Sequence, residues 1–173
     1  MTDVHSQETR SYNMSRIKAK DTKPELLVRK YLFSKGFRYR VNVKNLPGKP
    51  DIVLPKYKTV IFIHGCFWHG HEGCRYFVIP KTRTEWWTEK IRKNKERDQT
   101  KHLALRQTGW NVMTIWECQL KPATREATLE GIVLLLQKVY LNQQKKHTLM
   151  PYNTSEQELP MVAEPPSVYS SPE

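Results

Sequence analysis

An eleven-residue segment near the middle of the chain, HGCFWHGHEGC (64–74), constrains the fold more than any other stretch. It holds three of the chain's six histidines and two of its three cysteines. Imidazole and thiolate groups this close together are typical of a transition-metal site, and a structural zinc takes four such ligands. The third cysteine, Cys118, lies far downstream. A zinc site that used it would hold two distant parts of the chain side by side.

The spacing of the candidate ligands favours a structural zinc over a catalytic one. Cys66, His71 and Cys74 form the pattern C-x4-H-x2-C, and Cys118 supplies a fourth ligand. Four protein ligands leave no open position for water. The chain also lacks the two-histidine helix of zinc hydrolases and the Cys-x-x-Cys pair of nucleobase deaminases. The alternative is that Cys74 and Cys118 are ordinary buried thiols.

The charge of the chain points to a polyanionic partner. Lys and Arg total 29 against 17 Asp and Glu, a net charge of +12, and residues 147–173 contain four Glu and no Lys or Arg. A body this basic favours nucleic acid, although a solvated basic surface is the plain alternative. An acidic lipid surface is a weaker fit, because there is no basic amphipathic helix with an aromatic face. Three cysteines cannot all pair and fit metal binding better than disulfides, and we find no signal or membrane-spanning segment, so we expect a reduced, cytoplasmic compartment.

Periodicity and turn residues predict a mixed central β-sheet flanked by helices, an α/β fold in the order α-β-β-β-α-β-α. The run TVIFI (59–63) is apolar on both faces, so we expect it to be a central strand. Residues 1–20 should form a flexible basic arm, 21–146 the folded domain and 147–173 a disordered acidic, proline-rich tail. We expect helices at about 22–36, 84–109 and 123–145, strands at 37–43, 51–55, 59–63 and 110–116, and a buried face on the last helix made of Ile132, Leu135, Leu136, Val139 and Tyr140.

Further residues suggest chemistry outside the zinc set. Asp51 opens a predicted strand after a Pro/Gly turn, where a carboxylate can bind Mg²⁺, although the same residue suits the turn itself. His64 and His69 are not needed as zinc ligands, and strand ends and fixed loops often carry catalytic groups. Phe67 and Trp68 lie between metal ligands, a poor place for a core and a suitable one for a wedge between base pairs. Trp110 and Trp116 are expected to pack in the core.

Five segments in order, between about Arg10 and Leu120, resemble the very-short-patch repair (Vsr) endonucleases: RSYNMSRIKAKDTKPE, LPGKPDIVL, VIFIHGCFWH, TRTEWWTEKIRKNKERD and GWNVMTIWEC. The resemblance implies a restriction-endonuclease-like fold and a Mg²⁺-dependent DNA endonuclease of DNA repair. Its substrate would be duplex DNA nicked 5′ of the T in a T:G mismatch left by deamination of 5-methylcytosine. We expect a monomer, with mismatch-repair proteins as further partners.

The resemblance also implies roles for individual residues. Asp51 and the main-chain carbonyl of Ile63 would bind Mg²⁺, and Ile63 stands where the family usually has Thr. His64 and His69 would lie in the catalytic centre, His69 as a general acid or base, with Glu25 as a supporting carboxylate. The implied zinc ligands are Cys66, His71, Cys74 and Cys118, and the loop that holds the first three is one residue longer than the family pattern. The implied intercalating residues are Phe67, Trp68, Trp87 and Met14, of which Met14 would enter from the minor groove.

The basic stretch around Lys81–Lys101 is expected to supply phosphate contacts, with Lys90, Lys93 and Arg97 as the candidates. Two other functions remain open. One is a sequence-specific nuclease of the same fold that needs no mismatch. The other is a non-catalytic zinc module that binds distorted DNA.

Overall fold

The structure, a computed structural model, describes residues 6, 8–9, 12, 15–16 and 20–148. The predictions for Met14, for most of the N-terminal arm and for residues 149–173 lie outside this part of the chain. The elements within it are α2 (Lys23–Ser34), β1 (Ile52–Leu54), η1 (Pro55–Tyr57), β2 (Thr59–His64), α3 (Thr84–Gln107), β3 (Asn111–Trp116), η2 (Glu117–Leu120) and α4 (Arg125–Thr148).

In the described part of the chain, the strands form one mixed sheet in the order β1-β2-β3. β1 pairs with β2 in antiparallel fashion, and β2 pairs with β3 in parallel from Thr59 opposite Asn111 to His64 opposite Trp116. A parallel pair requires a long crossover connection, which the loop after β2 and helix α3 provide. The prediction that 59–63 is a central strand is confirmed, and the carboxyl ends of β2 and β3 lie side by side.

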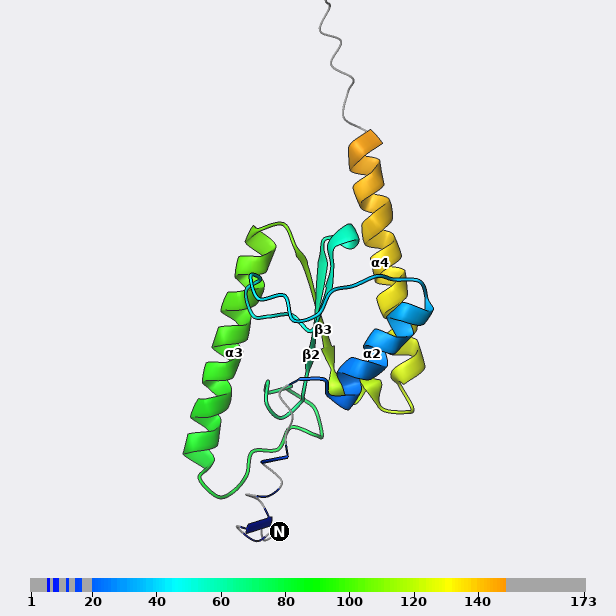
Figure 1. Cartoon of the computed structure of the whole chain (residues 1–173). Helices are drawn as coiled ribbons and strands as arrows, with labels where there is room; N and C mark the ends of the chain where they lie inside the picture. The colour runs from blue at the N-terminus through cyan, green and yellow to red at the C-terminus, as the bar shows by residue number, and fades with distance from the viewer. Residues whose placement is uncertain (1–5, 7, 10–11, 13–14, 17–19, 149–173) are drawn as a thin grey trace, which may run out of the picture.

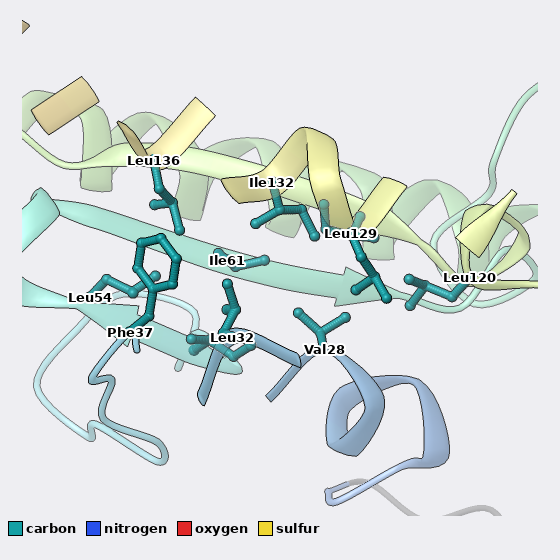
Figure 2. Packing of buried hydrophobic residues seen from close by; sticks show 11 residues of the cluster. Val28, Leu32, Phe37, Leu54, Ile61, Leu120, Leu129, Ile132 and Leu136 are labelled. Atoms are coloured by element: carbon teal, nitrogen blue, oxygen red, sulfur yellow. The ribbon is translucent and has the colours of Figure 1, made fainter. Parts of the chain in front are cut away.

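Helices cover both faces of this sheet, as Figure 1 shows, with α3 on one side and α2 and α4 on the other. Side chains of β2 alternate between the two faces. Ile61 packs in the larger core with α2 and α4 (Figure 2), whereas Val60 and Phe62 pack with Leu105 of α3. Because both faces are covered, β2 is apolar along almost its whole length. The predicted mixed sheet flanked by helices is confirmed.

Three details of the sequence prediction were wrong. The run 37–43 is not a strand: it makes a single bridge, from Arg40 to Val53, with two backbone hydrogen bonds of 2.8 Å. The left-handed backbone of Asn42 (φ 54°) interrupts the extended conformation there. β3 is not buried along its length, because it lies at the edge of the sheet and only Ile115 is fully covered. The third error concerns α4.

Helix α4 packs on the sheet through Leu129, Ile132 and Leu136, and Leu135 is 50% exposed instead of buried. Buried positions on a helix recur every three or four residues, and Leu135 lies one residue off this stripe. None of the helices in residues 20–148 combines the length and the apolar character needed to cross a membrane.

We predict that Leu136→Ala lowers the free energy of unfolding by about 2–5 kcal/mol, because it leaves a cavity between α4 and the sheet. Leu135→Ala is the matched control on the same helix and should change it by less than about 0.5 kcal/mol. Urea denaturation followed by circular dichroism measures both values. Equal losses in the two variants would contradict the packing described here.

Candidate active site and metal centre

The four predicted zinc ligands come together beyond the carboxyl ends of β2 and β3. One ligand atom each from Cys66, His71, Cys74 and Cys118 lies within 4.8 Å of all the others, and all three cysteines are free thiols. The strand register explains this meeting. Cys66 follows His64 by two residues, Cys118 follows Trp116 by two, and His64 pairs with Trp116. Three thiols and one imidazole in this arrangement suit a tetrahedral zinc.

The loop that carries the cluster packs against Trp116 of β3 and against helix α3. The ring of His71 stacks on Trp116 with centroids 4.1 Å apart and planes 2° apart. Gly70 has a left-handed backbone (φ 61°), and a Cβ there would come within 2.7 Å of Ile91 of α3, so only glycine lets the loop pack this closely. Burial raises the pKa of the Cys66 thiol to about 12, so its ionised form depends on a bound cation.

Trp116 was expected to serve only as core packing, and that prediction was wrong. Besides stacking on His71, it makes an edge contact with His64, with ring centroids 5.5 Å apart. It therefore lies between a zinc ligand and the second group of histidines. The edge position of β3 leaves its indole free to contact both.

The two remaining histidines of the segment form a second cluster with a carboxylate from α3. The rings of His64 and His69 stack with centroids 3.7 Å apart and planes 9° apart. Nδ1 of His69 lies 2.6 Å from Oδ2 of Asp98, and the His69 and Asp98 side chains are 29% and 20% exposed. Asp98 was not among the residues predicted from the sequence. The signal available there was an acidic residue within a strongly basic helix.

Burial and the neighbouring charges set the protonation of this cluster. Burial, followed by the His69 charge, lowers the pKa of His64 to about 3, so this ring is neutral at physiological pH. Burial also raises the pKa of Asp98, but its hydrogen bond to His69 and the nearby positive charges outweigh this and leave it below the usual value. The Asp98 carboxylate is therefore ionised and fit to hold the His69 ring.

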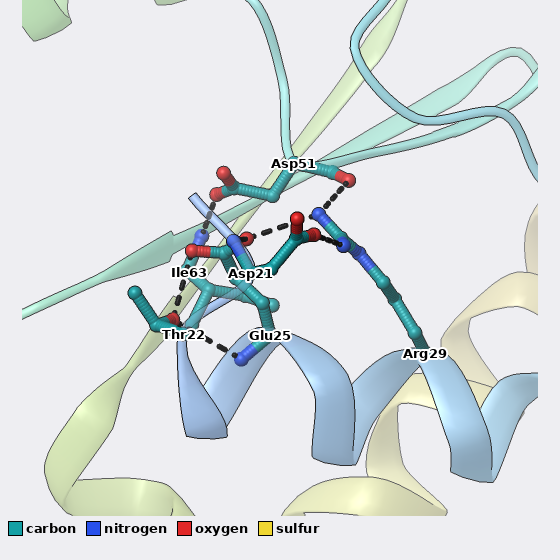
Figure 3. Close-up of polar contacts among 6 residues, drawn as sticks. All are labelled: Asp21, Thr22, Glu25, Arg29, Asp51 and Ile63. Atoms are coloured by element: carbon teal, nitrogen blue, oxygen red, sulfur yellow. Dashed lines mark hydrogen bonds and ion pairs between the residues drawn. The ribbon is translucent and has the colours of Figure 1, made fainter. Parts of the chain in front are cut away.

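Asp51 lies at the start of β1, with its carboxylate on the backbone of β2. Oδ2 of Asp51 accepts a 2.7 Å hydrogen bond from the N–H of Ile63 (Figure 3). The N–H and C=O of one residue in an antiparallel strand point to the same neighbouring strand, so the Ile63 carbonyl faces the same side as this carboxylate. Burial raises the pKa of Asp51 to about 6. A half-buried carboxylate beside a backbone carbonyl is a donor set that fits a hard cation such as Mg²⁺.

Glu25 lies near Asp51 and is connected to it by Arg29. It is 5% exposed, and its Oε2 accepts hydrogen bonds from Arg29 and from the N–H of Asp21, each 3.0 Å. Arg29 in turn donates to the main-chain oxygen of Asp51 at 3.2 Å. Figure 3 shows these residues linking the first turns of α2 to the start of β1. Because Glu25 also faces the Asp51 carboxylate electrostatically, it contributes to the raised pKa of Asp51.

The predicted intercalating residues that the structure describes form one aromatic cluster. Phe67 lies 5.2 Å from both Trp68 and Trp87, and Trp68 lies 6.0 Å from Trp87, measured between ring centroids. All three are half-buried, and Asn94 of α3 donates to the main-chain oxygen of Trp68 at 2.9 Å. Trp86 contacts the cluster only through Trp87 and is 54% exposed. Of the two adjacent tryptophans, Trp87 is thus the one that joins the zinc loop.

A wide cleft contains the carboxylates and the histidine pair, and its rim is basic. Asp51, His64, His69 and Asp98 line the cleft, and Trp68 borders it. Its basic lining residues are Arg16, Lys20, Lys23, Arg29, Lys44, Lys49 and Lys101. The predicted phosphate contacts Lys90, Lys93 and Arg97 line a shallow groove along α3. The tertiary structure thus collects metal donors, titratable groups and cations from segments spread between Arg16 and Glu117.

Comparisons with known proteins point to one family. A family profile described as DNA mismatch endonuclease Vsr matches residues 2–75. Type II nicking enzyme V.NmeAIP of Neisseria meningitidis is 56% identical over 121 residues, which cover 70% of this chain and 86% of that protein. Type II nicking enzyme V.XorIIP of Xanthomonas oryzae is 48% identical over 134 residues, 77% of this chain and 98% of that protein. DNA mismatch endonuclease Vsr of Escherichia coli is 48% identical over 121 residues, 70% and 77% of the two chains.

We predict that the purified protein contains about one zinc per chain, the stoichiometry of a four-ligand site. Cys118→Ser should reduce the zinc content sharply and lower the melting temperature, because the metal holds the loop after β2 to the end of β3. His69→Gln is the control within the same loop and should keep its zinc. Mass-spectrometric metal analysis and thermal denaturation measure both effects. An unchanged zinc content in Cys118→Ser would rule out this ligand set.

Proposed function

This chain belongs to the Vsr family of DNA endonucleases, and from that premise we propose that it nicks one strand of duplex DNA 5′ of the T in T:G mismatches. Such mismatches arise when 5-methylcytosine is deaminated, so the activity would serve very-short-patch repair. The observation that carries the proposal is that one basic cleft contains both the Asp51–Ile63 donor set and the His64–His69–Asp98 cluster. The zinc cluster serves as scaffold.

The Asp51 carboxylate and the Ile63 carbonyl would hold the catalytic Mg²⁺. The ion would supply positive charge that polarises the scissile phosphate and stabilises the leaving oxygen. The raised pKa of Asp51 supports this assignment, because a buried carboxylate gains most from a cation beside it. Arg29, held by Glu25, fixes the backbone of Asp51.

His69 is the proposed general acid or base. A carboxylate accepts from the Nδ1–H of an imidazole, so the bond to Asp98 leaves Nε2 with the lone pair that exchanges protons. Proton transfer by such a group typically accelerates a reaction about 10²–10⁴-fold. The neutral ring of His64 stacks against His69 and fixes its plane. The carboxylate and the stacked ring together restrain His69 in one orientation.

Mismatch recognition would come from the aromatic cluster. Flat side chains that wedge between base pairs cost a few kcal/mol of unstacking, and a mismatched pair is cheaper to open. Phe67 and Trp68 lie between two zinc ligands, Cys66 and His71, so the metal would keep them rigid. Trp87 joins them from α3. Rigid rings pay little entropy on insertion.

A nicking enzyme that needs no mismatch is the second candidate. Two relatives are named type II nicking enzymes, which favours nicking and specifies no mismatch. The two functions share the same cleft and chemistry. They differ only in whether the aromatic wedge must find a weakened base pair.

The test is strand nicking in Mg²⁺ on a T:G duplex and on its T:A match, in several methylation-site sequences. We expect nicking of the T:G duplex and none of the T:A duplex. Asp51→Asn should lower the nicking rate by at least about 100-fold, since the variant keeps the shape of the side chain but loses the charge that holds the metal. Equal nicking of both duplexes would favour the second candidate. Tighter binding to T:G without nicking would indicate a recognition module.

We predict a separate effect for Asp98→Asn. The variant keeps the size of the side chain but replaces the ionised carboxylate beside His69 with a neutral amide. The single-turnover nicking rate should fall by about 10²–10⁴-fold with little change in DNA affinity. Glu130→Gln, an exposed acidic residue on α4 that lines neither the cleft nor the groove along α3, is the control for loss of a carboxylate. A nicking rate in Asp98→Asn equal to that of the wild type would remove Asp98 from the proposed mechanism.

A further inference from the structure

Four cations form a stripe along one side of α3 and lead into the cleft. Lys90, Lys93, Arg97 and Lys101 are spaced by three, four and four residues, which places them on one helix face. All four line the shallow groove along α3. Lys101 also lines the cleft that contains Asp51, and in the described part of the chain it is the one residue common to the two linings. It thus marks the point where the groove opens into the candidate active site.

The stem of Lys101 is fixed against the loop that leads into Asp51. Its Cδ and Cβ atoms lie 3.1 and 3.2 Å from the position that a Cβ on Gly48 would occupy. Lys101 is half-buried at this contact. Packing of the methylene stem restricts the side chain while the ammonium group stays accessible. Lys101 therefore loses less conformational entropy on binding an anion than a fully exposed lysine does.

The charge of Lys101 acts on the histidine cluster. Lys101, His69 and Asp98 line the same cleft, and Asp98 lies three residues before Lys101 on α3. For Asp98, burial raises the pKa, and Lys101 is among the cations that more than offset this.

No carboxylate of the described residues forms an ion pair with this ammonium group. Asp98, three residues before Lys101 on α3, binds His69, and Glu96, five residues before it, binds Arg92. β2, which lines the cleft through Phe62, Ile63 and His64, contains no Lys or Arg. A half-buried cation without a partner is a favourable site for a phosphate oxygen.

We propose that Lys101 contacts the scissile phosphate and stabilises the negative charge on its nonbridging oxygens during cleavage. The inference rests on the proposed nuclease function and adds a catalytic residue to it. A fixed cation aimed at the charge of the transition state acts on the rate, whereas Lys90, Lys93 and Arg97 lie farther along α3 and act on affinity. Lys101 then forms the boundary between DNA binding and chemistry on this helix.

The test compares Lys101→Met and Lys101→Arg with the wild type on a T:G duplex in Mg²⁺, with single-turnover nicking and equilibrium binding measured separately. We expect Lys101→Met to lower the nicking rate by about 100-fold, with only a small loss of affinity, and Lys101→Arg to restore most of the rate. Lys93→Met should show the opposite pattern. It should bind DNA more weakly, its slope of log affinity against log salt concentration should fall by about one, and its nicking rate with bound DNA should stay near that of the wild type. Lys138→Met, on the exposed side of α4, controls for loss of charge alone.

Chemically modified duplexes identify the phosphate. Methylphosphonates at the phosphates on either side of the cut should leave the deficit of Lys101→Met unchanged, whereas one phosphorothioate diastereomer at the cut should alter it. A deficit that disappears with a neighbouring methylphosphonate would reassign Lys101 to anchoring, and a wild-type rate in Lys101→Met would overturn the inference. If the wild type nicks no duplex, the proposed function has failed and this inference fails with it. Zinc content and circular dichroism verify that each variant is folded.

Discussion

The parallel pairing of β2 with β3 is the constraint on which the rest of this structure depends. It sets His64 opposite Trp116, and two residues later it brings Cys66 near Cys118. Parallel strands cannot be joined by a tight turn, so the chain must cross over through a loop and a long helix. That crossover forms the zinc loop and α3, the two elements that carry most of the candidate site. One strand pairing therefore generates the scaffold, the histidine cluster and the basic helix together.

The zinc cluster and the histidine cluster are physically continuous. Trp116 stacks on the ligand His71 and contacts His64 at its edge, and His64 stacks on His69. Because packed aromatic rings transmit small displacements instead of absorbing them, a change in metal coordination would be felt at His69. Asp98 restrains the same ring from the opposite element, α3. An imidazole held from two sides, as His69 is, loses little freedom when it engages a substrate, as the proposed general acid or base must.

The carboxylates in the cleft lie in different electrostatic environments, which suit them to different roles. Asp51 is half-buried with a raised pKa and suits a metal ion, whereas Asp98 is held ionised by its histidine. Glu25 is neutralised by Arg29 and serves to fix the backbone of Asp51. The wall of the cleft is basic, which suits the phosphates of DNA. Glu25, Asp51 and Asp98 thus have three distinct partners within one cleft, and their environments set which of these charges remain available to a substrate.

The sequence by itself predicted which four Cys and His residues come together, the central strand and the helices that cover the sheet, because ligand chemistry and hydrophobic periodicity are local properties that spacing reveals. It also offered Asp51 as a candidate metal-binding carboxylate, a role that the family resemblance implied. It could not place Asp98 beside His69, because 29 residues separate them and only the crossover of α3 brings them together. The same holds for Trp116, whose contacts follow from the edge position of β3. Partners across a sheet and its covering helix depend on register and packing, and these only the tertiary structure decided.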